Sequence, residues 1–164
     1  MRALRCAGLL AFETALLLAC AGSVRISPAN RADPVPPAAE PIAFTTLVQA
    51  AVPGQSGAAV QEVVRDDAGY RALWAGLAVA EARPPVDFSR RMVIAAALPT
   101  QGCVAKVTIQ GIVRDATGLR IDVLEQYPGP DCRCIVSSRP FHVVALDRRS
   151  EPVRFHATRG PNTC

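Results

Sequence analysis

The stretch Met92-Val93-Ile94-Ala95-Ala96-Ala97-Leu98 is apolar without interruption. A short run that does not alternate with polar residues is typical of a strand that is buried on both faces. We therefore expect other segments of the chain to cover each face of this strand.

A single helix is predicted shortly before this strand. Asp66 or Asp67 can cap its first turn, because a carboxylate accepts hydrogen bonds from the unpaired backbone amides there. Arg83-Pro84-Pro85 would end it, since proline cannot continue a helix. Four apolar residues follow the cap at positions i, i+3, i+4 and i+7 and form one stripe: Tyr70, Leu73, Trp74 and Leu77. This stripe places the only tryptophan in the core rather than at a ligand site.

The rest of the predicted domain has the pattern of strands. Residues 104–113 alternate, with Val107 and Ile109 on one face and Ile112 on the other, and a hairpin loop at 115–118 leads to a partner strand at 119–123. A second hairpin is predicted around residues 148–149. Further strands are predicted at 44–52, 59–64, 141–146 and 152–157. One helix against roughly six or seven strands predicts an α+β domain of mainly antiparallel β-sheet with one packed helix.

The N-terminal segment has the features of an export signal. Arg2 and Arg5 precede an apolar run at residues 9–19, which is too short to span a bilayer as a permanent helix. The run ends in Leu17-Leu18-Ala19-Cys20, which resembles the lipobox of bacterial lipoprotein signal peptides. By that resemblance, Cys20 becomes the acylated first residue of the mature protein. Ala19-Cys20-Ala21 also fits the small-x-small pattern of ordinary secretory cleavage.

These features divide the chain into a signal peptide at 1–19, a lipid anchor and Pro/Ala-rich tether at 20–41, and a single domain at 42–164. The prolines of the tether lack the N–H donor that a helix or sheet interior needs. We expect the protein in the cell envelope, outside the cytosol and held to a membrane by the lipid on Cys20. The alternative location is a soluble periplasmic or secreted form.

Four cysteines lie in the predicted domain: Cys103, Cys132, Cys134 and Cys164. An even number in an exported domain of this size predicts two disulfides that staple the sheet. Opposed residues of an antiparallel hairpin have a constant index sum, so the hairpin near residue 116 brings Cys103 close to Cys132. The hairpin at 148–149 likewise brings Cys164 toward Cys134. We expect Cys103–Cys132 and Cys134–Cys164, and exchanging the two middle partners is the main rival.

A metal site is the competing interpretation of Cys132-Arg133-Cys134. Thiolates, with His142 or His156 as a further ligand, suit zinc or cuprous ions. The spacing is not a C-x-x-C pair, and an oxidising compartment favours disulfides. We therefore expect neither a metal nor another cofactor.

Composition and motifs argue against several classes of function. The formal net charge of +4 is too small to specify nucleic acid as a partner, and Arg90-Arg91 and Arg148-Arg149 are interpreted as solvated turns or strand ends. The chain lacks a G-x-S-x-G elbow, an H-E-x-x-H helix, a G-x-G-x-x-G turn and a phosphate-binding loop. Its carboxylates are dispersed along the sequence. We expect a protein that is not an enzyme and does not bind nucleic acid.

Three segments, in order, resemble PrcB-type C-terminal domains. The first is Val86-Asp87-Phe88-Ser89-Arg90-Arg91-Met92-Val93-Ile94-Ala95, which is similar to the family's V-D-F-S-x-x-M-V-I-A. The others are Pro140-Phe141-His142-Val143-Val144-Ala145-Leu146 and Pro152-Val153-Arg154-Phe155, similar to P-Y-H-x-V-x-x and the closing P-V-x-F. The resemblance covers about residues 60–157. The name-giving member of this family is a lipoprotein subunit of a bacterial surface protease complex.

The resemblance implies a non-catalytic exported domain that assists or contacts another protein, and it supplies no catalytic residues. We therefore expect a membrane-tethered accessory module that binds another envelope protein, with a protease as the partner that the resemblance indicates. The alternative function is that of a structural envelope domain that binds a small ligand or metal of unknown identity.

Overall fold

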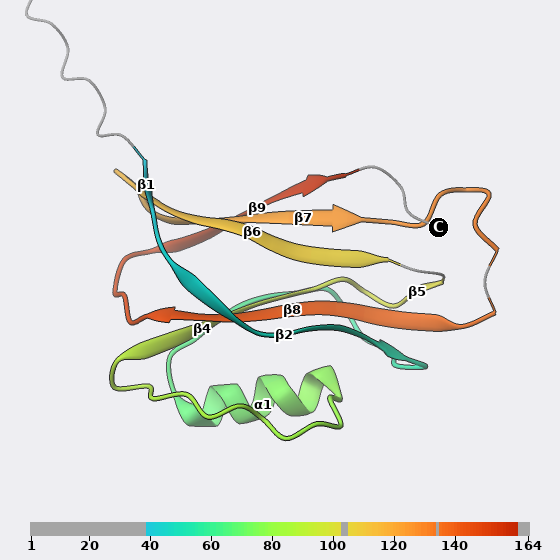
Figure 1. Cartoon of the computed structure of the whole chain (residues 1–164), viewed down its shortest axis with the longest axis horizontal. Helices are drawn as coiled ribbons and strands as arrows, with labels where there is room; N and C mark the ends of the chain where they lie inside the picture. The colour runs from blue at the N-terminus through green and yellow to red at the C-terminus, as the bar shows by residue number, and fades with distance from the viewer. Residues whose placement is uncertain (1–38, 103–104, 134, 161–164) are drawn as a thin grey trace, which may run out of the picture. The chain divides into compact units, whose positions relative to one another are not determined.

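The computed structural model describes residues 39–102, 105–133 and 135–160, which belong to a compact unit at 36–164. Two β-sheets and one helix are stacked in three layers (Figure 1). The elements are β1 (Glu40–Pro41), β2 (Phe44–Pro53), β3 (Val60–Val64), α1 (Asp67–Leu77), β4 (Arg91–Ala97), β5 (Gln101–Gly102), β6 (Lys106–Asp115), β7 (Gly118–Gln126), β8 (Ser137–Asp147) and β9 (Val153–Arg159).

One sheet has the strand order β1-β6-β7-β9, and the other has the order β2-β8-β4-β3, with β5 also paired to β8. Among the described strands, every pairing is antiparallel except that of β7 with β9, which is parallel. The prediction of a mainly antiparallel sheet with one packed helix is confirmed.

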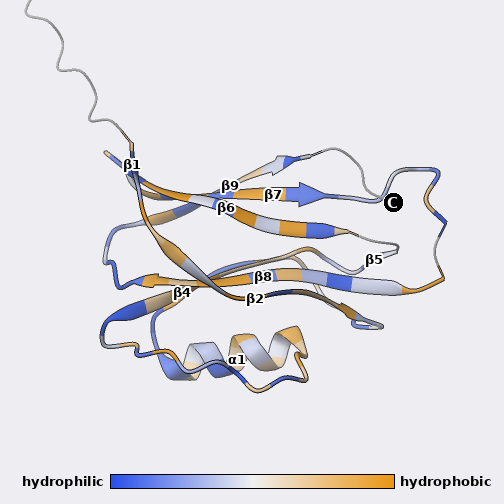
Figure 2. Ribbon diagram, viewed as in Figure 1, coloured by the Kyte–Doolittle hydropathy of each residue, from blue (hydrophilic) through white to orange (hydrophobic). Residues whose placement is uncertain are grey.

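The strand β4 is buried on both faces, as its uninterrupted apolar run predicted. Met92 and Ile94 face the core between the two sheets, where they pack with Ile109 and Ile121. Val93, Ala95 and Ala97 alternate with these residues, face α1 and pack with its apolar stripe. Figure 2 shows apolar residues along the central strands of both sheets. Two cores therefore share one strand.

The helix α1 begins where the sequence predicted and ends earlier. Asp66 is the N-cap, and its carboxylate accepts from the N–H of Gly69 at 2.8 Å. The helix stops at Leu77 because Ala78 adopts a left-handed conformation with φ 52° and its N–H bonds to the carbonyl of Ala75. The prediction that the prolines at 84–85 end the helix was therefore wrong. The tryptophan is buried in the core, as predicted.

A β-bulge in β6 reverses the predicted side-chain directions in the second half of this strand. Ile109 pairs with Val123, whereas Gly111 pairs with Asp122, so the register shifts by one residue at Gln110. A one-residue shift moves every later side chain to the opposite face. Ile112, predicted to face away from Ile109, is therefore buried in the same core at 1% exposure.

The hairpin predicted around residues 148–149 is not formed. The strand β8 lies in one sheet and β9 in the other, where β9 runs parallel to β7 with Leu119 opposite Val153 and Glu125 opposite Arg159. The segment between them crosses from sheet to sheet, and Pro152 accepts a hydrogen bond from the N–H of Leu119 at 2.8 Å. The register argument that placed Cys164 beside Cys134 is therefore lost.

The structure describes one of the cysteines in the predicted disulfides. Cys132 lies in the turn after β7, where its N–H donates to the carbonyl of Gly129 at 3.1 Å, and it is disulfide-bonded. The other cysteines of the predicted disulfides, Cys103, Cys134 and Cys164, and the predicted lipidation site Cys20 lie outside the described residues. Both alternative pairings stay predictions.

The folded part begins within the segment assigned to the tether. Glu40 and Pro41 form β1 and pair with Arg114 and Val113 of β6. The N–H of Ile42 then bonds to the carbonyl of Ile112 at 2.8 Å, before the chain enters the other sheet as β2. In the described part of the chain, no helix is long and apolar enough to cross a membrane.

Candidate anion-binding site

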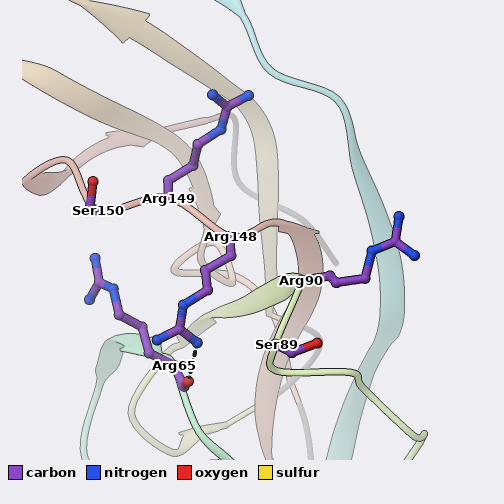
Figure 3. A pocket seen from close by; sticks show the side chains of 6 residues that line it. All are labelled: Arg65, Ser89, Arg90, Arg148, Arg149 and Ser150. Atoms are coloured by element: carbon purple, nitrogen blue, oxygen red, sulfur yellow. Dashed lines mark hydrogen bonds between the residues drawn. The ribbon is translucent and has the colours of Figure 1, made fainter.

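An open pocket of about 620 Å³ lies at the end of the domain where β4 begins and β8 ends. We call it the arginine pocket, after four of the six residues that line it: Arg65, Ser89, Arg90, Arg148, Arg149 and Ser150 (Figure 3). These residues come from three separate connections of the chain.

Strand pairing brings the three connections together. Arg91, at the start of β4, pairs with Asp147, at the end of β8, so the residues just outside this pair become neighbours. The N–H of Arg148 donates to the carbonyl of Arg90 at 2.7 Å. Arg65 joins them because β3 ends beside the start of β4.

Arg148 connects two of the segments that line the pocket through hydrogen bonds. Its Nη1 donates to the carbonyl oxygen of Arg65 at 2.8 Å (Figure 3). It also donates to the carbonyl oxygen of Phe88 at 2.6 Å. One guanidinium therefore ties the end of β3 to the turn that precedes β4.

Two carboxylates lie close enough to the arginine pocket to interact with its charge: Arg90 helps to lower the pKa of Asp87, and Arg149 helps to lower that of Glu151. Within the described residues, no carboxylate lies within ion-pair distance of the four arginines that line it. The nearby carboxylate of Asp87 instead accepts from the N–H and hydroxyl of Ser89 at 3.0 and 2.6 Å, and these bonds lower the pKa of Asp87. The Nε of Arg149 is buried without a hydrogen-bond partner.

This arrangement suits an oxyanion. A guanidinium is always charged and presents several donors in a plane, which match the oxygens of phosphate or carboxylate groups. Both arginine pairs lie at turns or strand ends, as the sequence predicted, and Arg90 and Arg148 are exposed. That the pairs line one pocket could not be predicted, because they lie 58 residues apart in sequence (148 − 90) and only the β4–β8 register makes them neighbours. Adjacent basic pairs at two strand ends were the only sequence signal.

His142, considered as a metal ligand in the sequence, instead joins the two sheets. It is 3% exposed, its Nδ1 accepts from the N–H of Ile109 at 2.8 Å, and its Nε2 lies 3.0 Å from the hydroxyl of Thr46. An accepting Nδ1 requires the neutral ring, with Nε2 donating to the hydroxyl. Burial, with a smaller effect of the Lys106 charge, lowers the pKa of His142.

We expect the stability of the protein to fall as the pH drops below about 6.5. The unfolded imidazole takes up a proton near that pH, whereas the folded ring stays neutral down to its lower pKa. The free energy of unfolding should therefore decrease by up to about 1.4 kcal/mol per pH unit in this window. Urea unfolding between pH 7.5 and 5 would measure this slope. His142→Gln should flatten the slope, and His156→Gln, which alters an exposed histidine, should not.

His156, the other histidine considered for a metal, lies on the outer face of the β1-β6-β7-β9 sheet. Its Nδ1 is 3.4 Å from Oδ1 of Asp122, which also accepts from the Nε of Arg120 at 2.9 Å. His142 is therefore buried between the sheets while His156 is exposed on an outer face, and the two histidines do not meet. Over the described ranges, no group of three or more His, Cys, Asp or Glu side chains is placed to hold a metal.

No family model, curated protein or solved structure matches this chain.

Proposed function

We propose that this protein is an exported, lipid-anchored accessory module that binds another protein of the cell envelope and has no catalytic activity of its own. The proposal includes membership of the PrcB-type C-terminal domains and a protease as the partner. It draws on the sequence features of the N-terminus, on the three family-like segments and on one surface feature of the domain.

The surface feature is an exposed apolar pair at the end of the domain opposite the arginine pocket. Ile135 is fully exposed and Val136 about half exposed, and they precede β8 directly. The N–H of Gly54 bonds to the carbonyl of Ser137 at 2.9 Å and fixes the base of this loop. Two adjacent large apolar side chains in water offer a surface that another protein could cover. This pair carries the protein-binding proposal.

The family-like segments fit the same proposal. Residues 86–95 include most of β4 and residues 140–146 lie in β8, and these two strands are paired, with Met92 opposite Leu146. Residues 152–155 enter β9. The motifs thus contribute to the shared core, which is the part of a domain that relatives with different partners would have in common.

Crosslinking in intact envelopes tests partner binding. We expect wild-type protein to capture a specific envelope protein and the double variant Ile135→Asp/Val136→Asp to lose at least about tenfold of that capture, because the contact would then place two charges against an apolar surface. Ala80→Asp/Ala82→Asp adds the same charge at exposed positions near α1 and is the matched control. Equal capture by all three proteins would contradict the proposed contact, and no capture by wild type would contradict the function.

Mass spectrometry of the mature N-terminus tests the anchor separately. We propose that the mature protein begins at an acylated Cys20 and that Cys20→Ser releases it from the membrane fraction. A mature chain that keeps its initiating methionine would overturn export itself. The disulfides belong to the same proposal, with the pairings Cys103–Cys132 and Cys134–Cys164 or their exchange left open for peptide mapping without reduction.

A further inference from the structure

We propose that the arginine pocket binds the phosphate of an anionic phospholipid headgroup and so orients the domain on the membrane that carries its anchor. This inference deepens the proposed function and rests on it, since the anchor is what brings the domain to a lipid surface.

The first support is the chemistry of the pocket. Four arginines and two serines line an open volume of about 620 Å³. Figure 3 shows the side chains of Arg90 and Arg149 directed away from those of Arg65 and Arg148, and the Ser89 hydroxyl donates to Asp87. The four arginines of the pocket form no ion pair within the described structure. An excess of positive charge at one end of a domain is suited to an anionic ligand.

The second support is the place where the tether joins the domain. The first described strand, β1, lies at the same end as the pocket (Figure 1), and β2 starts there with Phe44 opposite Leu146. The Nη2 of Arg91 reaches the hydroxyl of Thr45 at 3.3 Å, so the start of β2 contacts the residue next to Arg90. A coil of the length between Cys20 and Glu40 would span roughly 25 Å, which would keep this end within reach of the headgroups.

The exposed apolar pair lies at the other end. The strand β8 has 11 residues and separates the two ends by about 33 Å at ~3.3 Å per residue. With the pocket on the membrane, Ile135 and Val136 would point away from it and toward a partner. One strand therefore connects a lipid-facing end to a partner-facing end.

Vesicle co-sedimentation tests the proposal. The full chain with Cys20→Ser, which cannot be acylated at that site, is mixed with vesicles of phosphatidylcholine alone or with about a third of phosphatidylglycerol. The first kind of vesicle measures any binding through the apolar N-terminal run. We expect clearly greater binding to the second kind, and we expect Arg65→Gln/Arg90→Gln to reduce this difference by about tenfold or more. These two side chains make no hydrogen bond in the described structure, so the variant should fold.

Arg71→Gln/Arg133→Gln removes the same charge outside the pocket and should reduce the difference by less than about threefold. An equal loss in both variants would overturn the pocket in favour of net charge, and no preference of the wild type for phosphatidylglycerol would overturn the headgroup. Calorimetric titration with inorganic phosphate separates the sources: pocket-dependent phosphate binding without a vesicle preference would assign the site to a soluble phosphate instead. Loss of acylation or of partner capture in cells would contradict the proposed function and leave this vesicle result unchanged.

Discussion

Replacing Gly118 with alanine is expected to lower the free energy of unfolding by about 3–5 kcal/mol. Gly118 begins β7 with φ +123°, a conformation that side chains with a Cβ rarely adopt and that costs about 1–3 kcal/mol for a residue other than glycine. A Cβ at this position would lie 2.3 Å from the carbonyl oxygen of Pro152. That oxygen accepts the 2.8 Å bond from the N–H of Leu119, so moving it also weakens the contact between β7 and the crossing segment.

Urea unfolding followed by Trp74 fluorescence measures this loss. The matched control is Gly76→Ala, because a Cβ there would meet nothing within 4 Å and the position is in α1. Alanine is about 0.5–1 kcal/mol better than glycine in a helix, so the control should be stabilised. A Gly118→Ala protein as stable as wild type would show that the close approach of Pro152 is not required.

Replacing Arg139 with methionine is expected to cost about 3 kcal/mol of stability. Arg139 is 5% exposed on β8, and its guanidinium donates to the carbonyl of Gly76 at 2.6 Å and to that of Ala58 at 2.8 Å. One cation thus ties the last turn of α1 and the segment before β3 to the sheet. Hydrogen bonds from a charged donor contribute about 1.5–3 kcal/mol each, and the two carbonyls would lose their donors. A cation at a helix C-terminus also stabilises the helix dipole.

The free energy of unfolding of Arg139→Lys should lie between those of the wild type and Arg139→Met, because an ammonium lacks the planar arrangement of donors that reaches both carbonyls. Arg133→Met, at an exposed position, is the control and should change stability by less than about 0.5 kcal/mol. If Arg139→Met and Arg133→Met unfold at the same urea concentration, the link between helix and sheet contributes nothing to stability.

The differences between prediction and structure have identifiable physical causes. The apolar run at 92–98 and the stripe from Tyr70 to Leu77 predicted their elements correctly, because burial on one or two faces leaves a local pattern. The bulge at Gln110 leaves no such pattern, because one extra residue in a strand reverses the direction of the side chains that follow without changing the composition. The early end of α1 depended on Ala78, which carries no common helix-stop signal.

The candidate site likewise has features that the sequence predicts and others that only the structure shows. Both basic pairs are visible in the sequence, but their meeting depends on the register of β4 with β8. The sequence placed His142 in a strand and offered it as a possible metal ligand. Its role between the sheets comes from the N–H of Ile109, a backbone group that no side-chain pattern reports.

The sequence by itself determined that α1 packs its stripe inward, that β4 is buried on both faces and that the strands form a mainly antiparallel α+β domain. Only the tertiary structure decided that β9 joins β7 in parallel instead of folding back on β8, and that four arginines meet at one end. Local periodicity records which face of a segment is buried, whereas the choice of a neighbouring strand depends on packing between segments far apart in the chain.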